Sequence, residues 1–178
     1  MPFDKFLKRP LVTVVITCFN QGRFLYDAIA SVQKQTYPNI EIIVVDDGSS
    51  DNTRQVAVSL ANVKYFYQHN KGLSAARNHG VAHSNGLYIV FLDADDILYP
   101  EGIEHNLKYL FKNASWAFVS GGHLKVDEWL YPLENQDEGA TVSEKHFQAL
   151  LRGNYVGMHA AVMYRVVAWR HVGPLLWA

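Results

Sequence analysis

Apolar and polar positions predict strands and helices in turn along the first 113 residues. Four short runs rich in Val, Ile, Leu and aromatic residues have the pattern of strands, and each is followed by apolar residues at helical spacing. The predicted strands are 11–19, 40–47, 63–68 and 87–96, and the predicted helices are 24–35, 53–61, 72–84 and 100–113. This alternation predicts right-handed crossovers, and therefore a mainly parallel central sheet between two layers of helices, a three-layer α/β/α sandwich.

The second part of the chain has a less regular pattern. Residues 116–126 predict a strand with a Gly-Gly interruption, residues 127–143 a polar connection and residues 144–154 a helix. The tail, 159–178, predicts a short strand, a short helix and an apolar end. Because no internal repeat or low-complexity segment divides the chain, we expect one domain over residues 1–178.

Composition narrows the class of protein. With 178 residues, 49% of them hydrophobic, the chain is long enough to fold around a core. Its net charge of −1 gives no general attraction to nucleic acid, so we expect no nucleic-acid partner. Cys18 is the only cysteine, which excludes an intrachain disulfide and favours a reducing compartment. Because the sequence has neither a run of about 20 apolar residues nor a signal-peptide pattern, we expect a cytoplasmic protein without a membrane segment, with a peripheral position at the inner face of the membrane as the alternative.

Three acidic residues follow the apolar strand that ends the first half of the chain. If strand geometry continues through Ala94, Asp93 and Asp95 share one face, while Asp96 points away. Oxygen ligands favour hard divalent ions, and a site with one or two carboxylates leaves positions for water or phosphate, so Mg²⁺ or Mn²⁺ bridging a diphosphate fits. The alternative is a turn that caps the following helix.

A second acidic pair, Asp46 and Asp47, ends the neighbouring strand. Ligands of parallel sheets bind outside the carboxyl ends of the strands, so both groups of acids are expected at one edge. A carboxylate there distinguishes a base with a ring N–H, such as uracil, from a base with an acceptor at that position. The alternative is an Asx-turn beside a helix cap, for which Ser49, Ser50 and Asp51 are candidates.

Arg77 is the candidate for the compensating positive charge. The small residues before it, including Gly72 and Ser74, allow a ligand close to the helix backbone, and its guanidinium suits phosphate oxygens. Lys71 is a second cation nearby. The alternative role for Arg77 is a structural ion pair with an aspartate of the same edge.

Taken together, three segments resemble the family 2 glycosyltransferases, which have the GT-A fold. They are residues 12–53, from "VTVVITCFN" to "VVDDGSSDNT", then 70–81, "NKGLSAARNHGV", and 88–103, "YIVFLDADDILYPEGI". The resemblance covers roughly the first hundred residues and departs from the family in carrying Thr17 where many members have proline. It implies an inverting transferase that moves a sugar from a nucleotide donor, expected to be a UDP-sugar, to a hydroxyl of a carbohydrate or lipid-linked acceptor.

By position, the resemblance implies a donor site made of Thr17, Phe19, Asn20, Asp46, Asp47, Arg77, Asp93 and Asp95. The segment 17–20 would line the base and ribose pocket, and one acid of the pair 46–47 would contact the base. Arg77 would face the base and diphosphate. Asp93 would lie near the ribose and metal, and Asp95 would bind Mn²⁺ or Mg²⁺ directly.

The resemblance also divides the domain into a donor-binding half, residues 1–100, and an incomplete acceptor-side half, residues 101–178. The family's catalytic base is an aspartate of an acidic pair that follows a segment like "HAAVMYRVVAWRHVGPL", so we expect it beyond Ala178. Asp127 and Glu128 are weak candidates within the chain. One alternative function is a donor-binding module with impaired catalysis. The other is a sugar nucleotidyltransferase, which "TCFNQGRF" disfavours because it is not a Gly-rich phosphate loop.

Several other residues have a structural interpretation. His79 and His83 share a helix face and are expected at the surface, while His159 is a weak candidate for sugar or acceptor contact. Most of the tryptophans, which are Trp116, Trp129, Trp169 and Trp177, are expected in the core, with an exposed Trp177 as the exception. The sugar, the acceptor, the choice among UDP, dTDP and GDP, and the oligomeric state are not predicted.

Overall fold

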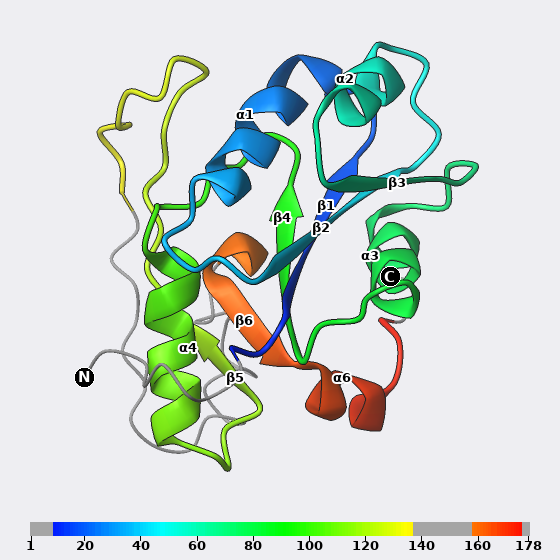
Figure 1. Cartoon of the computed structure of the whole chain (residues 1–178). Helices are drawn as coiled ribbons and strands as arrows, with labels where there is room; N and C mark the ends of the chain where they lie inside the picture. Colours follow the sequence, from blue (N-terminus) through cyan, green and yellow to red (C-terminus); the bar gives the residue numbers. More distant parts are fainter. Residues whose placement is uncertain (1–8, 137–157, 176–178) are drawn as a thin grey trace.

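The computed structural model describes residues 9–136 and 158–175. In this part of the chain, six strands form one sheet in the order β3-β2-β1-β4-β6-β5 (Figure 1). The strands are β1 (Val12–Cys18), β2 (Ile40–Asp46), β3 (Val63–Tyr67), β4 (Tyr88–Asp93), β5 (Phe118–Ser120) and β6 (Val162–Arg165). The pairs among β1 to β4 are parallel, whereas β6 is antiparallel to both β4 and β5. The predicted mainly parallel sheet is therefore confirmed.

Helices cover both faces of this sheet. They are α1 (Gly22–Gln33), α2 (Thr53–Ser59), α3 (Leu73–Ala82), α4 (Gly102–Lys112) and α6 (Val166–Val172), with a 3₁₀ turn η1 (His159–Ala161) before β6. Buried side chains of α1, α2 and α4 pack on one face of the sheet, and those of α3 and α6 pack on the other. Successive residues of β1 alternate between these two cores, which explains why all of β1 is buried. The three-layer architecture is confirmed.

Some predicted boundaries are wrong. The strand expected at 116–126 is limited to Phe118–Ser120, and a separate pairing of Val126 with Pro132 closes a small hairpin further on. The strand expected at 87–96 ends at Asp93, because the N–H of Asp96 donates to the Asp93 carbonyl at 3.0 Å and closes a turn. The helix predicted at 144–154 lies outside the described residues.

Gly80 fixes the distance between α3 and the sheet. A Cβ at this position would overlap Val15 Cγ1, so the helix approaches β1 as closely as a side-chain-free position allows. Arg77 lies about one turn before Gly80 on α3, and this close approach carries it toward the sheet.

The register of the strands determines which residues meet at the carboxyl edge. Thr17 is paired with Asp93 across β1 and β4, and Cys18 is paired with Asp46 across β1 and β2. The segments after β1, β2 and β4 therefore leave the sheet at one edge. This is the edge at which the sequence predicts the donor site.

Candidate functional site

Asp93 is the meeting point of three elements. Thr17 Oγ1, from β1, donates a hydrogen bond to Asp93 Oδ1 at 2.9 Å. Arg77 Nη2, from α3, lies 3.1 Å from the same oxygen and 3.2 Å from Oδ2. The ion pair expected as the alternative role of Arg77 is therefore present, and any ligand that contacts Arg77 meets Asp93 as well.

Arg77 is deeply placed for a charged residue, with only 6% of its side chain exposed. Its guanidinium carbon lies 5.8 Å from the centre of the Phe91 ring, in the range of a cation–π contact. Its Nε is buried without a hydrogen-bond partner among the described residues. A buried donor without a partner is costly, so this arginine has unused capacity for an acceptor.

Asp95 does not continue the strand. Ala94 and Asp95 form a turn after β4, and Asp95 Oδ2 accepts a hydrogen bond at 2.8 Å from Gln21 Nε2, in the segment that leads into α1. The strand geometry that would put Asp93 and Asp95 on one face is therefore not found, because the turn intervenes. Asp95 is exposed at the edge, and Gln21 is a neighbour that the sequence pattern did not reveal.

Negative charge is concentrated at the end of β4. Partial burial, followed by the negative charges of Asp93 and Asp95, raises the pKa of Asp96 to about 6. Such an effect requires the three carboxylates to lie close to one another. An oxygen-only set of this kind suits a hard divalent cation, and it leaves coordination positions open. In residues 9–136 and 158–175, no three or more His, Cys, Asp and Glu side chains are arranged so that together they could hold a metal ion.

The acidic pair after β2 is buried and hydrogen-bonded. Asp46 Oδ1 accepts from the N–H of Ser49 at 2.8 Å, and its Oδ2 accepts from Tyr65 OH at 2.7 Å. Ser49 lies three residues after Asp46, so this bond is not the expected Asx-turn, which joins a side chain to the N–H two residues on. Asp47 accepts from the N–H groups of Lys71 and Gly72 at 2.9 Å each, so it fixes the segment that leads into α3.

Hydrogen bonds also tie the loop after β1 to the loop after β2. The N–H of Asn20 donates to Ser49 Oγ at 2.9 Å, and Asn20 Oδ1 accepts from the N–H of Ser50 at 2.8 Å. Asp51 Oδ2 accepts from the N–H of Gly22 at 2.9 Å. The other oxygen of Asp51 accepts from the N–H and the hydroxyl of Thr53, the first residue of α2. The N-cap itself is Asn52, so the N-cap predicted among residues 49–51 is wrong. These hydrogen bonds hold the loop after β1 and the loop after β2 in a fixed position relative to each other.

Phe19 is half exposed beside these loops. It projects from the segment that follows β1, next to Asn20, whose backbone has a positive φ of 54°. Asparagine tolerates this left-handed conformation better than most residues. The turn thereby leaves an aromatic ring accessible at the carboxyl edge, where the sequence predicts the pocket for the base and ribose.

His159 approaches the same cluster from the second part of the chain. Partial burial, followed by the positive charge of Arg77, lowers the pKa of His159, while Asp93 acts in the opposite direction. Tyr164 OH lies 3.3 Å from His159 Nδ1. The structure therefore brings His159, a weak candidate for sugar or acceptor contact from the sequence, toward Arg77 and Asp93.

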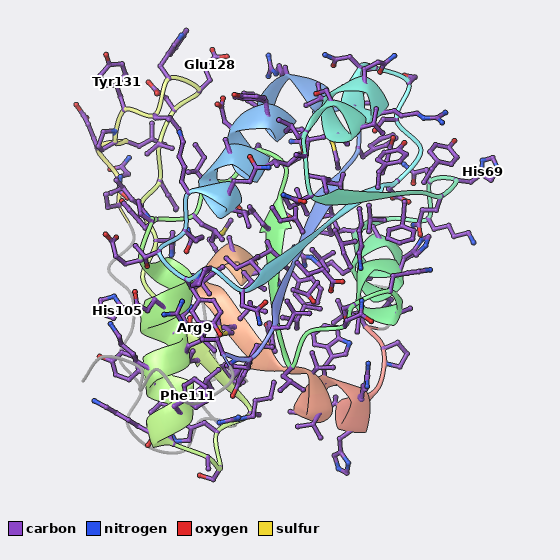
Figure 2. All side chains as sticks on the ribbon, viewed as in Figure 1. Arg9, His69, His105, Phe111, Glu128 and Tyr131 are labelled. Carbon is purple, nitrogen blue, oxygen red and sulfur yellow. The ribbon has the colours of Figure 1, made fainter. Side chains whose placement is uncertain are left out.

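Asp127 and Glu128 belong to the small hairpin closed by Val126 and Pro132. Asp127 Oδ1 accepts from the N–H groups of Trp129 and Tyr131, both at 2.9 Å, so it fixes the hairpin turn. Figure 2 shows Glu128 at the outer end of this hairpin. These contacts give Asp127 a structural role, and no described contact joins either acid to the Arg77 and Asp93 cluster.

The remaining candidates divide between surface and core. Trp116 and Trp129 are exposed, so core packing is wrong for both, whereas Trp169 packs 5.0 Å from the Phe91 ring centre as expected. Trp177 lies outside the described residues. His83 is exposed as predicted, but His79 is only partly exposed.

A hollow lined by four residues of α4, including His105, lies on the outer side of that helix, where Figure 2 labels His105.

Comparison with known proteins identifies the family. The profile described as "Glycosyl transferase family 2" matches residues 13–172. The chain belongs to this family. As a family 2 glycosyltransferase sequence, it is 41% identical over 123 residues to an uncharacterized glycosyltransferase of Rickettsia felis. That match covers 67% of this chain and 20% of the relative, so the chain spans about a fifth of the relative's length.

Two solved structures support the fold of this family 2 chain. The mannosyltransferase PcManGT of Pyrobaculum calidifontis, solved with GDP-Man and Mn²⁺, superposes with a TM-score of 0.56 at 25% identity, over 64% of this chain and 35% of that one. S. aureus TarS 1-349, solved with UDP-GlcNAc, has a TM-score of 0.65 at 21% identity, over 88% of this chain and 45% of that one. The GT-A fold inferred from the sequence is therefore confirmed. Within the described ranges, no helix is long and apolar enough to cross a membrane.

Proposed function

We propose that the chain holds the nucleotide-sugar donor of an inverting glycosyltransferase, which transfers the sugar to a hydroxyl of a carbohydrate or lipid-linked acceptor. Residues 1–100 form the donor-binding half of a single domain, and residues 101–178 belong to its acceptor side. The observation that carries the proposal is the cluster of Thr17, Arg77 and Asp93 at the carboxyl edge of a family 2 sheet. Arg77 is buried, yet one of its donors has no partner.

The base and ribose lie against the loops after β1 and β2. Thr17, Phe19 and Asn20 line this part of the pocket, and the half-exposed Phe19 ring offers a surface for stacking. The carboxylate of either Asp46 or Asp47 accepts a hydrogen bond from the base. Both accept hydrogen bonds from the protein, so each acts as an acceptor and favours a base that presents an N–H, as uracil does. A UDP-sugar fits this acceptor, and a dTDP-sugar, whose base carries the same ring N–H, is the alternative.

The diphosphate lies between Arg77 and the acids after β4. The guanidinium of Arg77 supplies the positive charge for the phosphate oxygens, because charge-assisted hydrogen bonds of this kind are strong. Asp95 would hold Mn²⁺ or Mg²⁺, with Asp93 nearby, since carboxylate oxygens suit a hard divalent ion. The solved complex of PcManGT with GDP-Man and Mn²⁺ supports a divalent metal in this role. The metal supplies Lewis-acid stabilisation of the charge on the departing nucleoside diphosphate. The chain's own part is to hold the donor and exclude water around the phosphates.

The second candidate function is donor binding without transfer. It is favoured by one observation, which is that Asp127, a carboxylate considered as the base, is occupied by the turn of its hairpin. An inverting transfer needs a carboxylate within hydrogen-bond reach of the acceptor hydroxyl. Release of UDP from a UDP-sugar in the presence of acceptor sugars distinguishes transfer from binding alone.

Calorimetric titration of UDP into the chain tests the donor site. With Mn²⁺ present we expect saturable binding, and with a chelator we expect binding at least about tenfold weaker, since the diphosphate loses its bridging cation. GDP and dTDP serve as comparisons. Equal binding with and without metal would remove the metal from the proposal, and no binding of any of the three nucleotides would overturn the donor site.

A further inference from the structure

Two side chains outside the donor-site assignment form a relay to Asp47. Gln68 follows β3, and its Nε2 donates a hydrogen bond to Asp47 Oδ1 at 2.7 Å. Gln68 Oε1 lies 2.7 Å from Nδ1 of His79, which belongs to α3. The relay therefore runs from α3 through the end of β3 to the carboxylate after β2.

The direction of each hydrogen bond in the relay is fixed. A carboxylate accepts, so the Gln68 amide must present its NH₂ group to Asp47 and its oxygen to His79. An amide oxygen only accepts, and His79 must therefore carry a hydrogen on Nδ1. If the amide turned over, its oxygen would face Asp47 Oδ1, and two acceptors would repel each other. Asp47 thus sets the orientation of the Gln68 amide, and His79 supports that orientation by donating from Nδ1 to Gln68 Oε1.

The relay also decides which oxygen of Asp47 is open to a ligand. Oδ1 accepts hydrogen bonds from Gln68 Nε2 and from the N–H of Lys71. These two bonds use both lone pairs of Oδ1. Oδ2 accepts from the N–H of Gly72 alone, so one lone pair remains. Among the described residues, Asp47 is therefore a fixed acceptor that is 4% exposed, with one lone pair on Oδ2 that no hydrogen bond uses.

The ring of His79 is itself held in place. The Phe66 ring of β3 lies 5.8 Å from the His79 ring and 4.2 Å from the His83 ring, and the two imidazoles are 4.8 Å apart. His83 Nδ1 lies 2.9 Å from the His79 carbonyl oxygen. His79 packs on Phe66 and keeps its Nδ1 within hydrogen-bond distance of Gln68, a contact that does not involve His83.

We propose that Gln68 and His79 are positioning residues for nucleobase selection: by fixing Asp47 as an acceptor with one open lone pair, they favour uracil, which presents a ring N–H, over cytosine, which presents a ring acceptor. The proposal rests on the proposed function, because it assumes that Asp47 is the acid that meets the base. It assigns base preference to residues that do not touch the ligand.

The test compares the affinities of UDP and CDP by calorimetry with Mn²⁺ present. Gln68→Leu removes the donor to Oδ1 and frees the carboxylate to turn, so we expect the ratio of UDP affinity to CDP affinity to fall about tenfold, the value of one hydrogen bond to a charged group. His79→Ala releases the Gln68 amide and lowers the ratio in the same direction. His79→Asn offers an amide N–H near the position of Nδ1, and we expect it to restore the ratio.

Two controls separate positioning from stability. His83→Ala removes a ring that also packs on Phe66 but leaves the relay intact, and Gln55→Leu replaces an exposed glutamine of α2. Neither control is expected to change the ratio, even if the melting temperature moves. An unchanged ratio in folded Gln68→Leu and His79→Ala overturns the inference while leaving the donor site in place. A lowered ratio in His79→Ala that His79→Asn does not restore also overturns it. If the unsubstituted chain binds no nucleoside diphosphate, the proposed function fails and this inference fails with it.

Discussion

Arg77 and Asp93 form an ion pair, with Nη2 3.1 Å from Oδ1, that joins α3 to the end of β4. The arginine side chain is 6% exposed and that of the aspartate is 30% exposed, so the positive charge is anchored inside while the negative charge reaches solvent. A ligand that arrives here therefore meets the Asp93 carboxylate first, and the guanidinium behind it is already oriented by this counter-ion. Such preorganisation lowers the cost of ordering the arginine when an anion binds.

Replacing Arg77 by alanine tests its contact with the diphosphate. We expect UDP to bind at least about tenfold more weakly, while uridine, which lacks phosphate, changes by less than about threefold. Arg54→Ala is the matched control, because Arg54 is an exposed cation on α2. Both ligands are titrated into both variants. Equal weakening of UDP and uridine would assign Arg77 to the base or to the fold.

Asp95 is tested with asparagine rather than alanine, because an amide oxygen preserves the hydrogen bond from Gln21. Loss of the negative charge weakens the binding of a hard divalent ion at this site. We therefore expect UDP binding to lose its dependence on Mn²⁺. The measurement is the ratio of UDP affinities with Mn²⁺ and with chelator. Asp27→Asn, at an exposed position of α1, is the control and should keep the ratio of the unsubstituted chain. A metal dependence that survives Asp95→Asn would contradict the assignment.

Gly80→Ala tests the close packing of α3 on β1. The added methyl overlaps Val15 Cγ1, and we expect a loss of about 1–3 kcal/mol in the free energy of unfolding measured with urea. Val15→Ala alone is destabilising because it leaves a cavity, but the double variant is expected to be more stable than the sum of the two single changes. Gly102→Ala, where a Cβ meets nothing within 4 Å, should change stability by less than about 1 kcal/mol. Strict additivity of the two changes would mean that the contact does not limit α3.

Glu41 lies at the amino-terminal end of β2, opposite the candidate site, and makes the stability of the fold depend on pH. Burial raises the pKa of Glu41, but hydrogen bonds from Asn85, Lys64 and Thr13 outweigh it and lower the pKa from 4.5 to about 2. A lowered folded-state pKa contributes stability that is complete above about pH 4.5 and is lost as the pH falls through about 2. We expect a contribution on the order of 2–3 kcal/mol at pH 7, of which about 40% remains at pH 3.

Urea unfolding of Glu41→Gln at pH 7 and pH 3 measures this contribution. The difference between the unsubstituted chain and the variant should shrink as the pH falls, because the carboxylate advantage disappears. Glu101→Gln, an exposed position at the start of α4, should show a small and constant difference. A Glu41→Gln difference that is the same at both pH values would show that the loss comes from packing rather than from ionisation.

The sequence predicted the parallel part of the fold well because hydrophobic periodicity is a local property. The runs that became β1, β2 and β4 are apolar on both faces, and the expected helices follow them. The pattern could not show that β6 would lie between β4 and β5, since pairing of segments far apart depends on the whole sheet. For the same reason, the strand expected at 116–126 was too long.

The candidate site was only partly predictable. The rule that ligands meet the carboxyl ends of parallel strands was enough to select Asp93 and Arg77, which the structure joins. Gln21 and Gln68 were missed because a glutamine in a loop has no periodic signature, and its partner depends on how two loops meet. The ion pair given as the alternative for Arg77 is present, and Asp46 accepts from the N–H of Ser49, so both side chains are held by the protein itself.

The insertion of β6 between β4 and β5 has a consequence for the order in which the protein is made. The ribosome completes β1 to β4 first, and β4 then presents an unpaired edge toward the place that β6 will occupy. β5 is synthesised earlier than β6, which is its hydrogen-bonded partner in the sheet. β5 therefore cannot join the sheet until Val162–Arg165 has left the ribosome. During this interval the nascent chain carries an open apolar strand, which is a site for chaperone binding and for mispairing with other chains.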